Sequence, residues 1–554
     1  MGNHGKNTAY LAKLILTYAD GTTETIVTDT NWKTAKAAAL QEGTGIFEGE
    51  RYDARVDQSW MLPGYDDSAW GAPVINREFN GRITAWSGDT VKVREDLERS
   101  AEQITVYQGA DGATSSNYGK IHVLRTYADG DVIALNPGET LLVDFGQNFA
   151  GWEAFELQAQ AGTKLVVNHG EILNDGNGAR SRGCDGPEGS INNANYRSAS
   201  ANTVYIASGA ENEHYHPSHS FYGFRYIEVT TDKPVTFTRI SGQVVTSVQR
   251  DTGWLDTSND DVNQLISNIR WGMYSNYLSV PTDCPQRDER QGWLADTQVF
   301  TEAGSFFSYS KSFLEKYLID LRDSQSLRSG GSYPGAAPAG ADSGYTWGGH
   351  GWADAGVIIP YFLYVMYGDT DIIRDHWDSM KKFMDVFMAG TNKYGGNHTY
   401  GDWLSYESND GTIKNMLGIS YYAWVALLMS EMAAAIGLED EAVRYMAVYE
   451  DEKAFYQSLF VNGDGTLKRS EQSVCLYALY LDLLPNEESV LAVTNQLISN
   501  IERNGNKLQT GFLGTAIINN TLTKIGRRGL DDRGADPEER HVQCCHLQQC
   551  RCHR

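Results

Sequence analysis

Cysteine is scarce and unevenly placed in this sequence. Only seven cysteines occur among 554 residues, and four of them lie within the last eleven positions. The other three, Cys184, Cys284 and Cys475, are scattered along the rest of the chain. A disulfide framework needs many cysteines in a short chain, so the sequence excludes a small disulfide-stabilised fold.

The last residues differ in composition from everything before them. From about Arg527 onward aromatic residues disappear while arginine, cysteine and histidine increase, as an out-of-frame translation would produce. This interpretation makes 528–554 a tail outside the native domain sequence. The alternative is a metal site, because zinc prefers thiolate and imidazole ligands, although the spacing does not match a two-plus-two finger. Its candidate ligands are Cys544, Cys545, Cys550, Cys552, His541, His546 and His553.

Positive charge and long apolar runs are also in short supply. Lys and Arg total 46 against 71 Asp and Glu, which gives a formal net charge of −25. A surface this acidic repels phosphate backbones, so we expect no nucleic-acid partner. The longest apolar runs, such as 423–429, are shorter than the roughly 18–20 residues of a membrane helix. The first residues lack the apolar core of a signal peptide. We therefore expect no membrane insertion, while compartment and oligomeric state stay open.

Up to about residue 250 the hydrophobic pattern is that of β-strands. Short alternating runs recur between Gly, Asn and Asp turn signals at 139–145, 152–157, 164–169, 222–230 and 235–245. Such spacing is typical of β-sandwiches. We therefore predict two jelly-roll-like β-sandwich domains, a partial one over 1–104 and a second over 105–250.

Near residue 255 the period changes to that of helices. Asn259 lies in an N-cap motif (SNDD, 258–261), and apolar residues then recur at i, i+3, i+4 and i+7 from Val262. Consecutive helices joined by short loops favour a helical toroid, and the lack of a fixed-length repeat argues against a solenoid. We expect an all-α domain over 251–527, with helical stretches at 297–322, 352–367, 372–389, 419–436, 439–459, 471–483 and 488–504.

The densest group of chemically useful side chains lies at 280–300 (VPTDCPQRDERQGWLADTQVF). Pro285 suits the first position of a helix. A helix that begins there places Glu289, Trp293 and Asp296 on one face.

Two carboxylates, a guanidinium and an indole on one surface suit sugar recognition. Arg287 and Asp288 would flank the face that carries Glu289. A neighbouring anion and burial by tryptophan raise a carboxyl pKa toward that of a proton donor, whereas a helix N-terminus lowers it, and the balance stays open. The alternative is a solvated acidic helix with a buried tryptophan.

Aromatic residues beside aspartates recur at later loop–helix junctions. The glycine-rich segment 343–356 (SGYTWGGHGWADAG) leads into a helix, and Gly401-Asp402-Trp403 opens another loop. Several tryptophans at such junctions favour a carbohydrate cleft over isolated core residues. The chemically useful residues of the glycine-rich segment are Tyr345, Trp347, His350, Trp352 and Asp354.

The segment 283–296 (DCPQRDERQGWLAD) resembles a specific signature of bacterial α-L-rhamnosidases of glycoside hydrolase family 78. The resemblance covers about 9–527. Further segments resemble the family in the same order: YDARVDQSWMLPGYDDSAW (52–70), VDFGQNFAGW (143–152), HGEIL (169–173), HSFYGFRYIEV (219–229), WADAGVIIP (352–360), GDWL (401–404) and QTGFLGT (509–515).

This resemblance implies an (α/α)6 barrel that hydrolyses terminal α-L-rhamnosides with inversion. Glu289 matches the general acid, and the positions that match the aromatic wall around rhamnose are Trp293, Trp352 and Trp403. Sugar-hydroxyl or supporting positions match Asp283, Arg287, Asp288 and Asp296. Rhamnose-containing glycosides are then the expected partners, and we expect no metal and no cofactor.

Two parts of the family pattern are missing. The family's general base is a glutamate in a G-[AS]-T-x-x-W-E-type segment after the match to QTGFLGT, and this sequence has no such segment. The first half of the family's N-terminal β-domain is absent as well, and 255–527 has room for fewer than the twelve helices of a full toroid. We therefore interpret the chain as a rhamnosidase-like sequence that is cut at the front and frameshifted at the back, so that its helical toroid is incomplete.

Two other functions remain as alternatives. A catalytically impaired fragment would keep the tryptophan wall and bind carbohydrate without hydrolysing it. A different (α/α)6 enzyme, such as a phosphorylase or a polysaccharide lyase, would need a phosphate pocket or a basic site for uronate. The acidic balance and the DCPQRDER segment make these enzymes poor matches.

Overall fold

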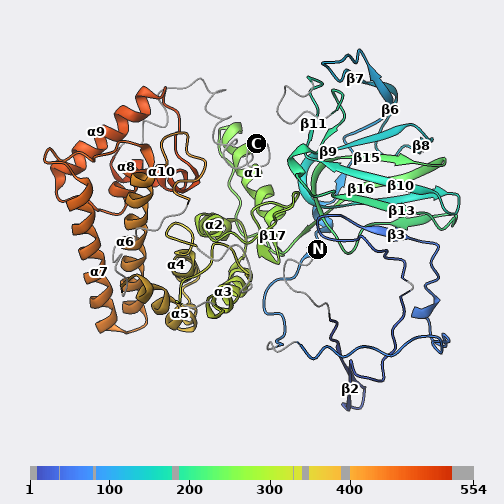
Figure 1. Ribbon diagram of the computed structural model, residues 1–554, viewed down its shortest axis with the longest axis horizontal. Helices are drawn as coiled ribbons and strands as arrows, with labels where there is room; N and C mark the ends of the chain where they lie inside the picture. Colours follow the sequence, from blue (N-terminus) through green and yellow to red (C-terminus); the bar gives the residue numbers. More distant parts are fainter. Residues whose placement is uncertain are drawn as a thin grey trace. The chain divides into compact units, whose positions relative to one another are not determined.

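The computed structural model describes residues 9–36, 38–78, 83–177, 186–327, 330–339, 348–388 and 400–526. The chain divides into two compact units, the first β-rich and the second helical, in the order that the sequence predicts (Figure 1). The first unit comprises Met1–Trp86, Val93–Val245 and Pro285–Asp288, and the second comprises Ser87–Lys92, Thr246–Cys284 and Glu289–Arg554. The domain boundaries at 104, 250 and 527 stay predictions, and the tail 528–554 with its candidate metal ligands lies outside the described residues.

The first unit is built on a twelve-stranded sheet. Its main path runs β3-β13-β10-β15-β9-β16-β4, and five further strands pair off this path. β10 and β15 are antiparallel, with Leu165 opposite Thr231, whereas β3 runs parallel to β13. The strands of this sheet are β3 (Arg51–Asp53), β4 (Lys92–Val93), β5 (Arg99–Ser100), β6 (Gln103–Asp111), β7 (Lys120–Tyr127), β8 (Ile133–Leu135), β9 (Thr140–Ala159), β10 (Lys164–Gly170), β13 (Asn202–Ile206), β14 (Glu213–Tyr215), β15 (Tyr222–Thr231) and β16 (Val235–Thr246). A separate pair joins β11 (Ile172–Leu173) to β12 (Ile191–Asn192).

The long strand β9 changes partners along its length. Residues 140–144 pair with β6, whereas 151–159 pair with β16. Between these stretches Gly146 has a φ of +72°, a conformation that favours glycine. At Gly151 a Cβ would overlap the carbonyl oxygen of Gln243 on β16. Two glycines in this strand therefore permit the bend and the close strand pairing that join the parts of the sheet.

Aromatic side chains fill the core beside this bend. Phe145, Phe149 and Phe224 are fully buried, with ring centroids 4.5 to 6.0 Å apart. A Cβ on Gly242 would overlap the ring of Phe149. The alternation of buried and exposed positions along β9 and β10 is the pattern from which these strands were predicted.

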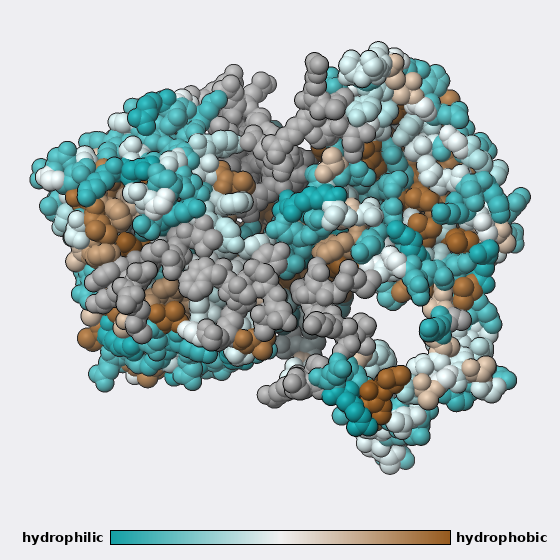
Figure 2. Space-filling model, viewed as in Figure 1, coloured by the Kyte–Doolittle hydropathy of each residue, from teal (hydrophilic) through white to brown (hydrophobic). Residues whose placement is uncertain are grey.

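A small hairpin precedes the main sheet. β1 (Lys13–Thr17) pairs antiparallel with β2 (Thr23–Val27) as a separate two-stranded sheet. Its apolar side chains Leu14, Ile15, Ile26 and Val27 are exposed among the described residues. In Figure 2 a brown hydrophobic patch lies over this hairpin. Such a pair is marginal by itself, because two strands bury little apolar surface.

The second unit consists, among its described residues, of ten α-helices and one two-stranded ladder, β17 (Tyr277–Leu278) with β18 (Val280–Pro281). Asn259 caps the first helix, since its Oδ1 accepts hydrogen bonds from the N–H groups of Asp261 (2.9 Å) and Val262 (3.2 Å). This cap confirms the helix start predicted from the SNDD motif. The helices are α1 (Asp260–Asn276), α2 (Leu294–Phe307), α3 (Lys311–Ser326), α4 (Ala355–Tyr367), α5 (Asp371–Met388), α6 (Gly411–Ala435), α7 (Glu439–Phe460), α8 (Gln472–Tyr480), α9 (Glu487–Arg503) and α10 (Phe512–Lys524).

The even-numbered helices of this unit form a ring. α2 packs against α4, α4 against α6, α6 against α8, α8 against α10, and α10 against α2. α5, α7 and α9 each pack against the even-numbered helix before them. Helical hairpins that present one helix to a central ring are the repeating unit of an (α/α) toroid, and five ring helices are present in the described part of the chain.

Most of helix α6 is buried within the ring. It is the one described helix that is long and apolar enough to cross a membrane, but 83% of its apolar window is buried by the rest of the protein. A helix that is hydrophobic on all sides and covered by neighbouring helices is a core helix.

Shortening a buried side chain of α6 tests this packing. We expect Leu417→Ala to lower the free energy of unfolding of the helical unit by about 2–5 kcal/mol, because Leu417 is fully buried and its loss leaves a cavity. The matched control Leu491→Ala removes the same atoms from an exposed position of α9 and should cost less than about 0.5 kcal/mol. Urea denaturation of both variants gives the comparison, and equal costs would contradict a core role for α6.

Candidate functional site

The segment 283–293 is an irregular loop, so the helix predicted from Pro285 is wrong. Helix α2 begins only at Leu294. The loop is closed by Asp283, whose N–H donates to the carbonyl of Gln291 (3.0 Å) and whose Oδ1 accepts from the Gln291 N–H (2.8 Å). Arg290 has a left-handed φ of +52°, which a right-handed helix does not allow. Tertiary hydrogen bonds thus override the helical spacing of the sequence.

Glu289 and Trp293 nevertheless meet within this loop. The indole Nε1 of Trp293 donates a hydrogen bond to Glu289 Oε1 (2.9 Å). A carboxyl oxygen of Asp283, one of Glu289 and the Sγ of Cys284 all lie within 4.8 Å of one another. The loop therefore brings the predicted acid, a second carboxyl group and the predicted indole together without a helical face.

The surroundings of Asp283 raise the pKa of its carboxyl group. Burial has the largest effect, and together with the negative charges of Glu289 and Asp296 it raises the pKa of Asp283 to about 6. Hydrogen bonds from the Gln291 N–H and the Cys284 thiol act in the opposite direction. The proximity of Glu289 therefore contributes to the raised pKa of Asp283.

The same three ligand atoms could hold a cation by distance alone. The Cys284 thiol is instead buried and hydrogen-bonded to Asp283, and no histidine joins the group. Two carboxylates and one thiol do not match the Cys and His sets of structural zinc sites. The expectation that this site works without a metal stays a prediction.

The ring of Tyr400 contacts all three of the predicted tryptophans. Its centroid lies 6.0 Å from that of Trp293, 4.6 Å from that of Trp352 and 6.0 Å from that of Trp403. The tryptophans come from the loops before α2, α4 and α6. Trp352 is 3% exposed and Trp403 47% exposed, so the aromatic cluster extends from the interior to the surface. The cluster has the geometry of an aromatic wall, and its role in sugar binding stays a prediction.

A buried ion-pair geometry fixes the turn that carries Trp352. His350 Nδ1 donates to Asp354 Oδ1 (2.9 Å), and the Gly351 N–H donates to the other oxygen of Asp354. Gln298 of α2 donates its Nε2 to the carbonyl of Gly351 (2.6 Å). Three hydrogen bonds thus tie this turn to the start of α4 and to α2. The other two aromatic candidates of this segment, Tyr345 and Trp347, lie outside the described residues.

Asp402 connects the loop of Trp403 to helix α10. Its carboxylate is fully buried and accepts hydrogen bonds from the N–H groups of Gly511 (2.7 Å), Leu513 (3.0 Å) and Gly514 (3.2 Å). The hydroxyl of Ser473 on α8 also donates to it. Burial raises the pKa of Asp402, and these hydrogen bonds oppose the shift. The aspartate of the GDW motif is therefore an N-terminal cap of α10 rather than a group that faces the substrate.

The QTGFLGT segment holds the same loop from the other side. The Phe512 N–H donates to the carbonyl of Trp403 (3.1 Å), and the Tyr406 N–H donates to the carbonyl of Gln509 (3.0 Å). The ring of Phe512 lies 5.6 Å from that of Trp352. Two motifs more than a hundred residues apart thus form one support for the aromatic cluster.

Arg287 and Asp288 do not flank a helical face, because the predicted helix is absent. Asp288 accepts hydrogen bonds from the Ser198 N–H (3.2 Å) and the Ser198 hydroxyl, and Arg197 lies 3.6 Å from its Oδ1. Burial acts to raise the pKa of Asp288, but the hydrogen bonds from Ser198 act in the opposite direction, and the pKa is lowered overall. Asp288 is therefore ionised at neutral pH and anchors the loop directly before Glu289. Arg287 is half-buried in the same stretch, Pro285–Asp288, which belongs to the first unit.

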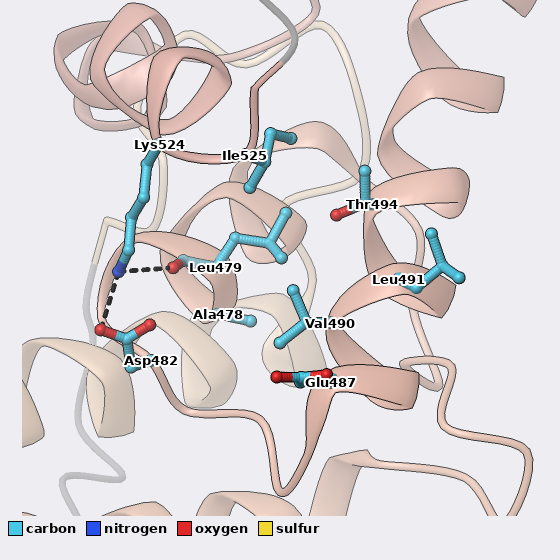
Figure 3. A pocket seen from close by; sticks show the side chains of 9 residues that line it. All are labelled: Ala478, Leu479, Asp482, Glu487, Val490, Leu491, Thr494, Lys524 and Ile525. Atoms are coloured by element: carbon cyan, nitrogen blue, oxygen red, sulfur yellow. Dashed lines mark hydrogen bonds and ion pairs between the residues drawn. The ribbon is translucent and has the colours of Figure 1, made fainter.

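A different pocket lies between α8, α9 and α10 (Figure 3). Lys524 bridges its rim, with Nζ 2.7 Å from Asp482 and 3.2 Å from the carbonyl oxygen of Leu479. Its volume of about 280 Å³ is near the low end for ligand pockets. The lining has no aromatic ring and none of the predicted site residues, so this pocket is a poor carbohydrate cleft. The lining residues are Ala478, Leu479, Asp482, Glu487, Val490, Leu491, Thr494, Lys524 and Ile525.

Sequence reasoning missed three residues of the main site. Tyr400 lies at the centre of the aromatic cluster, Phe512 supports Trp352, and Cys284 contacts Asp283. The position of Tyr400 directly before the GDW motif was the one signal for it. Phe512 lies within the QTGFLGT segment, but that segment did not indicate its contact with Trp352, which spans 160 residues of chain.

The raised pKa of Asp283 predicts a pH-dependent stability. The folded state holds the proton more tightly than the unfolded state, so ionisation of Asp283 costs folding free energy as the pH rises from about 4 to about 6. Asp283→Asn removes this cost. We expect the free energy of unfolding of Asp283→Asn, taken relative to wild type, to be higher at pH 7 than at pH 4 by up to about 3 kcal/mol.

Urea denaturation at the two pH values measures this difference. Asp451→Asn, an exposed change on α7, serves as control and should show no pH-dependent gain above about 0.5 kcal/mol. A stability difference for Asp283→Asn that is the same at pH 4 and pH 7 would rule out the raised pKa.

Removal of the Asp402 carboxylate tests the cap of α10. We expect Asp402→Ala to cost at least about 3 kcal/mol of unfolding free energy, because three backbone N–H groups lose a charged acceptor. Ser473→Ala removes only one donor and should cost about 1 kcal/mol. Tryptophan emission should change in Asp402→Ala because Trp403 shares its loop. Equal stability of the two variants would contradict the cap.

Comparisons with known proteins agree with this arrangement. The bacterial alpha-L-rhamnosidase 6 hairpin glycosidase domain matches residues 250–535. The bacterial alpha-L-rhamnosidase concanavalin-like domain matches 134–246, and the alpha-L-rhamnosidase N-terminal domain matches 2–95. The predicted architecture, β-sandwich domains followed by a six-hairpin helical toroid, is therefore confirmed.

Individual relatives are similar over almost the whole chain. An alpha-L-rhamnosidase of Streptomyces avermitilis is 33% identical over 529 residues, which cover 94% of this chain and 46% of that protein. The crystal structure of a Streptomyces avermitilis alpha-L-rhamnosidase complexed with L-rhamnose matches with a TM-score of 0.79 at 31% identity, again over 94% and 46% of the two chains. An alpha-L-rhamnosidase structure from Dictyoglumus thermophilum gives a TM-score of 0.78 at 26% identity, over 94% of this chain and 54% of that one.

The chain spans about half the length of the curated relatives it matches. Within that span three successive family domains match in order, and the six-hairpin domain alone covers more than half of the chain. These matches agree with the DCPQRDERQGWLAD segment and with the ring of helices. The chain belongs to the family of bacterial α-L-rhamnosidases.

Proposed function

We propose that the chain is a glycoside hydrolase that removes terminal α-L-rhamnose by an inverting acid/base mechanism, with Glu289 as general acid. Membership of the α-L-rhamnosidase family supports the reaction class. The observation that carries the proposal is the hydrogen bond from Trp293 Nε1 to Glu289 Oε1, beside the buried carboxyl of Asp283. This arrangement fixes the orientation of the Glu289 carboxyl group beside a second carboxyl group.

The chemistry of the acid follows from its two neighbours. In this mechanism Glu289 donates a proton to the leaving-group oxygen, with a carboxyl oxygen of Asp283 within 4.8 Å of its own carboxyl oxygen. After transfer, the Trp293 N–H stabilises the carboxylate that forms on Glu289. Because the indole occupies Oε1, the other oxygen of Glu289 is the one that delivers the proton.

Asp283 is too close to Glu289 to act as the base of an inverting enzyme. Inversion needs a second carboxylate roughly 6.5–9.5 Å from the acid, which leaves room for the attacking water. Carboxyl oxygens of Asp283 and Glu289 lie within 4.8 Å of each other. We therefore assign Asp283 to tuning the acid and to binding a sugar hydroxyl, and the water-activating base to a different carboxylate.

The remaining site residues suit recognition of a deoxy sugar. Rhamnose carries a methyl group where a hexose has a hydroxymethyl group, and an aromatic wall favours such a surface. Trp293, Trp352 and Trp403 form that wall in the proposal. Asp296 and Arg287 bind or orient sugar hydroxyls, and Asp288 holds the loop before Glu289 through its hydrogen bonds to Ser198.

Carbohydrate binding without turnover is the second candidate function. It is favoured by the absence from this sequence of the family's base segment. In this reading the aromatic cluster still binds rhamnose, while hydrolysis is lost. Measuring binding and hydrolysis on the same protein separates the two functions.

Glu289→Gln tests the acid directly. With an aryl α-L-rhamnoside, we expect kcat to fall by about 10²–10⁴-fold, because the amide cannot protonate the leaving group. L-Rhamnose binding, followed by tryptophan fluorescence, should change less than threefold, since glutamine can still accept the Trp293 hydrogen bond. Glu488→Gln, an exposed change on α9, serves as control and should leave both quantities unchanged.

Three outcomes bear on the proposal. Loss of turnover in Glu289→Gln with binding retained supports it, and a metal chelator should have no effect on wild-type turnover. Rhamnose binding by a wild-type chain that releases no product would favour the binding function. Full activity of Glu289→Gln would exclude Glu289 as the acid.

A further inference from the structure

The ring of Tyr400 is the shared contact of three tryptophans that are otherwise far apart in sequence. It lies against Trp293, Trp352 and Trp403 at centroid distances of 6.0, 4.6 and 6.0 Å. Two of these contacts are edge-to-face, at interplanar angles of 88° and 84°, and that with Trp352 is tilted at 47°. Edge-to-face contacts of this kind fix ring orientations as well as positions.

The backbone around Tyr400 is held rigidly. Asn409 donates its Nδ2 to the Tyr400 carbonyl (2.8 Å) and accepts the Asp402 N–H on Oδ1 (3.2 Å). Between them Gly401 has a φ of +67°, and a Cβ at this position would overlap the Asn409 side chain. Only glycine fits there, and the turn that results sets the direction of both Tyr400 and Trp403.

The hydroxyl of Tyr400 has no hydrogen-bond partner among the residues that the structure describes. Trp293, its neighbour, has already committed its indole N–H to Glu289. Burial raises the pKa of Tyr400, so the phenol stays protonated at neutral pH and can both donate and accept. The side chain is only half-buried, which leaves the hydroxyl open to a ligand.

These contacts link Tyr400 to the acid as well as to the wall. Trp293 touches Tyr400 on one side and hydrogen-bonds Glu289 on the other. A change that displaces the ring of Tyr400 therefore alters the position of the indole that orients Glu289. A change that removes only the hydroxyl leaves this chain of contacts intact.

We propose that Tyr400 is a substrate-contact residue whose ring orients the three tryptophans and whose hydroxyl hydrogen-bonds a hydroxyl group of the bound glycoside. This inference rests on the proposed function and names a further residue of the same site. A sugar presents hydroxyl groups at the edge of its ring and apolar C–H groups on its face. A tyrosine within an aromatic wall meets both kinds of group.

Two substitutions separate the ring from the hydroxyl. Tyr400→Phe keeps the ring, so we expect kcat for an aryl α-L-rhamnoside to stay within twofold while KM and the dissociation constant of L-rhamnose rise about three- to tenfold. Tyr400→Ala removes the ring, so kcat/KM should fall more than about a hundredfold and tryptophan emission should change. Unlike Tyr400→Ala, the Tyr400→Phe variant should therefore have the kcat and the emission spectrum of wild type, while its KM stays raised.

Tyr445→Phe is the matched control. Its hydroxyl also lacks a hydrogen-bond partner among the described residues, but Tyr445 is fully buried, lies on α7 and contacts none of the three tryptophans. This variant should match wild type in kcat, KM and rhamnose affinity. The control shows that loss of an arbitrary tyrosine hydroxyl does not weaken binding.

The outcomes distinguish this inference from the proposed function. An unchanged KM and rhamnose affinity in Tyr400→Phe would overturn the hydroxyl contact, and unchanged kcat/KM in Tyr400→Ala would overturn the role of the ring. If folded wild-type protein neither binds L-rhamnose nor hydrolyses the rhamnoside, the proposed function itself fails and this inference fails with it. If wild type binds rhamnose without turnover, the affinities alone decide the role of Tyr400.

Discussion

The buried carboxylate of Asp402 is the interaction on which the site depends most. It accepts three backbone N–H groups at the start of α10 and a hydroxyl from α8, while its own backbone carries Trp403 into the aromatic cluster. A charged group without a counter-cation is tolerated at this depth because the donors at a helix N-terminus replace water. The cap thus fixes α10, α8 and the loop before α6 at one point of the ring, and the position of the wall follows from it.

A second constraint acts on the acid. The hydrogen bonds between Asp283 and Gln291 close a loop in which the two carboxyl groups cannot separate, and burial keeps their repulsion strong. The same loop ends in Trp293, which occupies the position directly before α2 and donates a hydrogen bond to Glu289. The orientation of the acid and that of Trp293 are therefore properties of one short segment, and Tyr400 joins that segment to the other two tryptophans.

Sequence reasoning predicted the architecture but not the local backbone of the site, and the roles of the site residues stay predictions. The cap at Asn259 was predictable because capping is decided by a few neighbouring residues. The helix expected from Pro285 was wrong. The loop that forms instead is closed by the hydrogen bonds between Asp283 and Gln291 and contains Arg290 in a left-handed conformation. These contacts lie outside any helical pattern. Trp293, Trp352 and Trp403 were identified from their motifs, whereas Tyr400 and Phe512 were not, since their partners are distant in sequence and only the fold brings them together.

The stereochemistry of the product tests the central claim most directly. Proton NMR of the wild-type chain acting on an aryl α-L-rhamnoside identifies the anomer released before mutarotation. An inverting mechanism, with Glu289 as acid and a base farther away than Asp283, predicts that β-L-rhamnose forms first. Initial release of α-L-rhamnose would contradict the account, because it requires a nucleophile as close to the acid as Asp283 is.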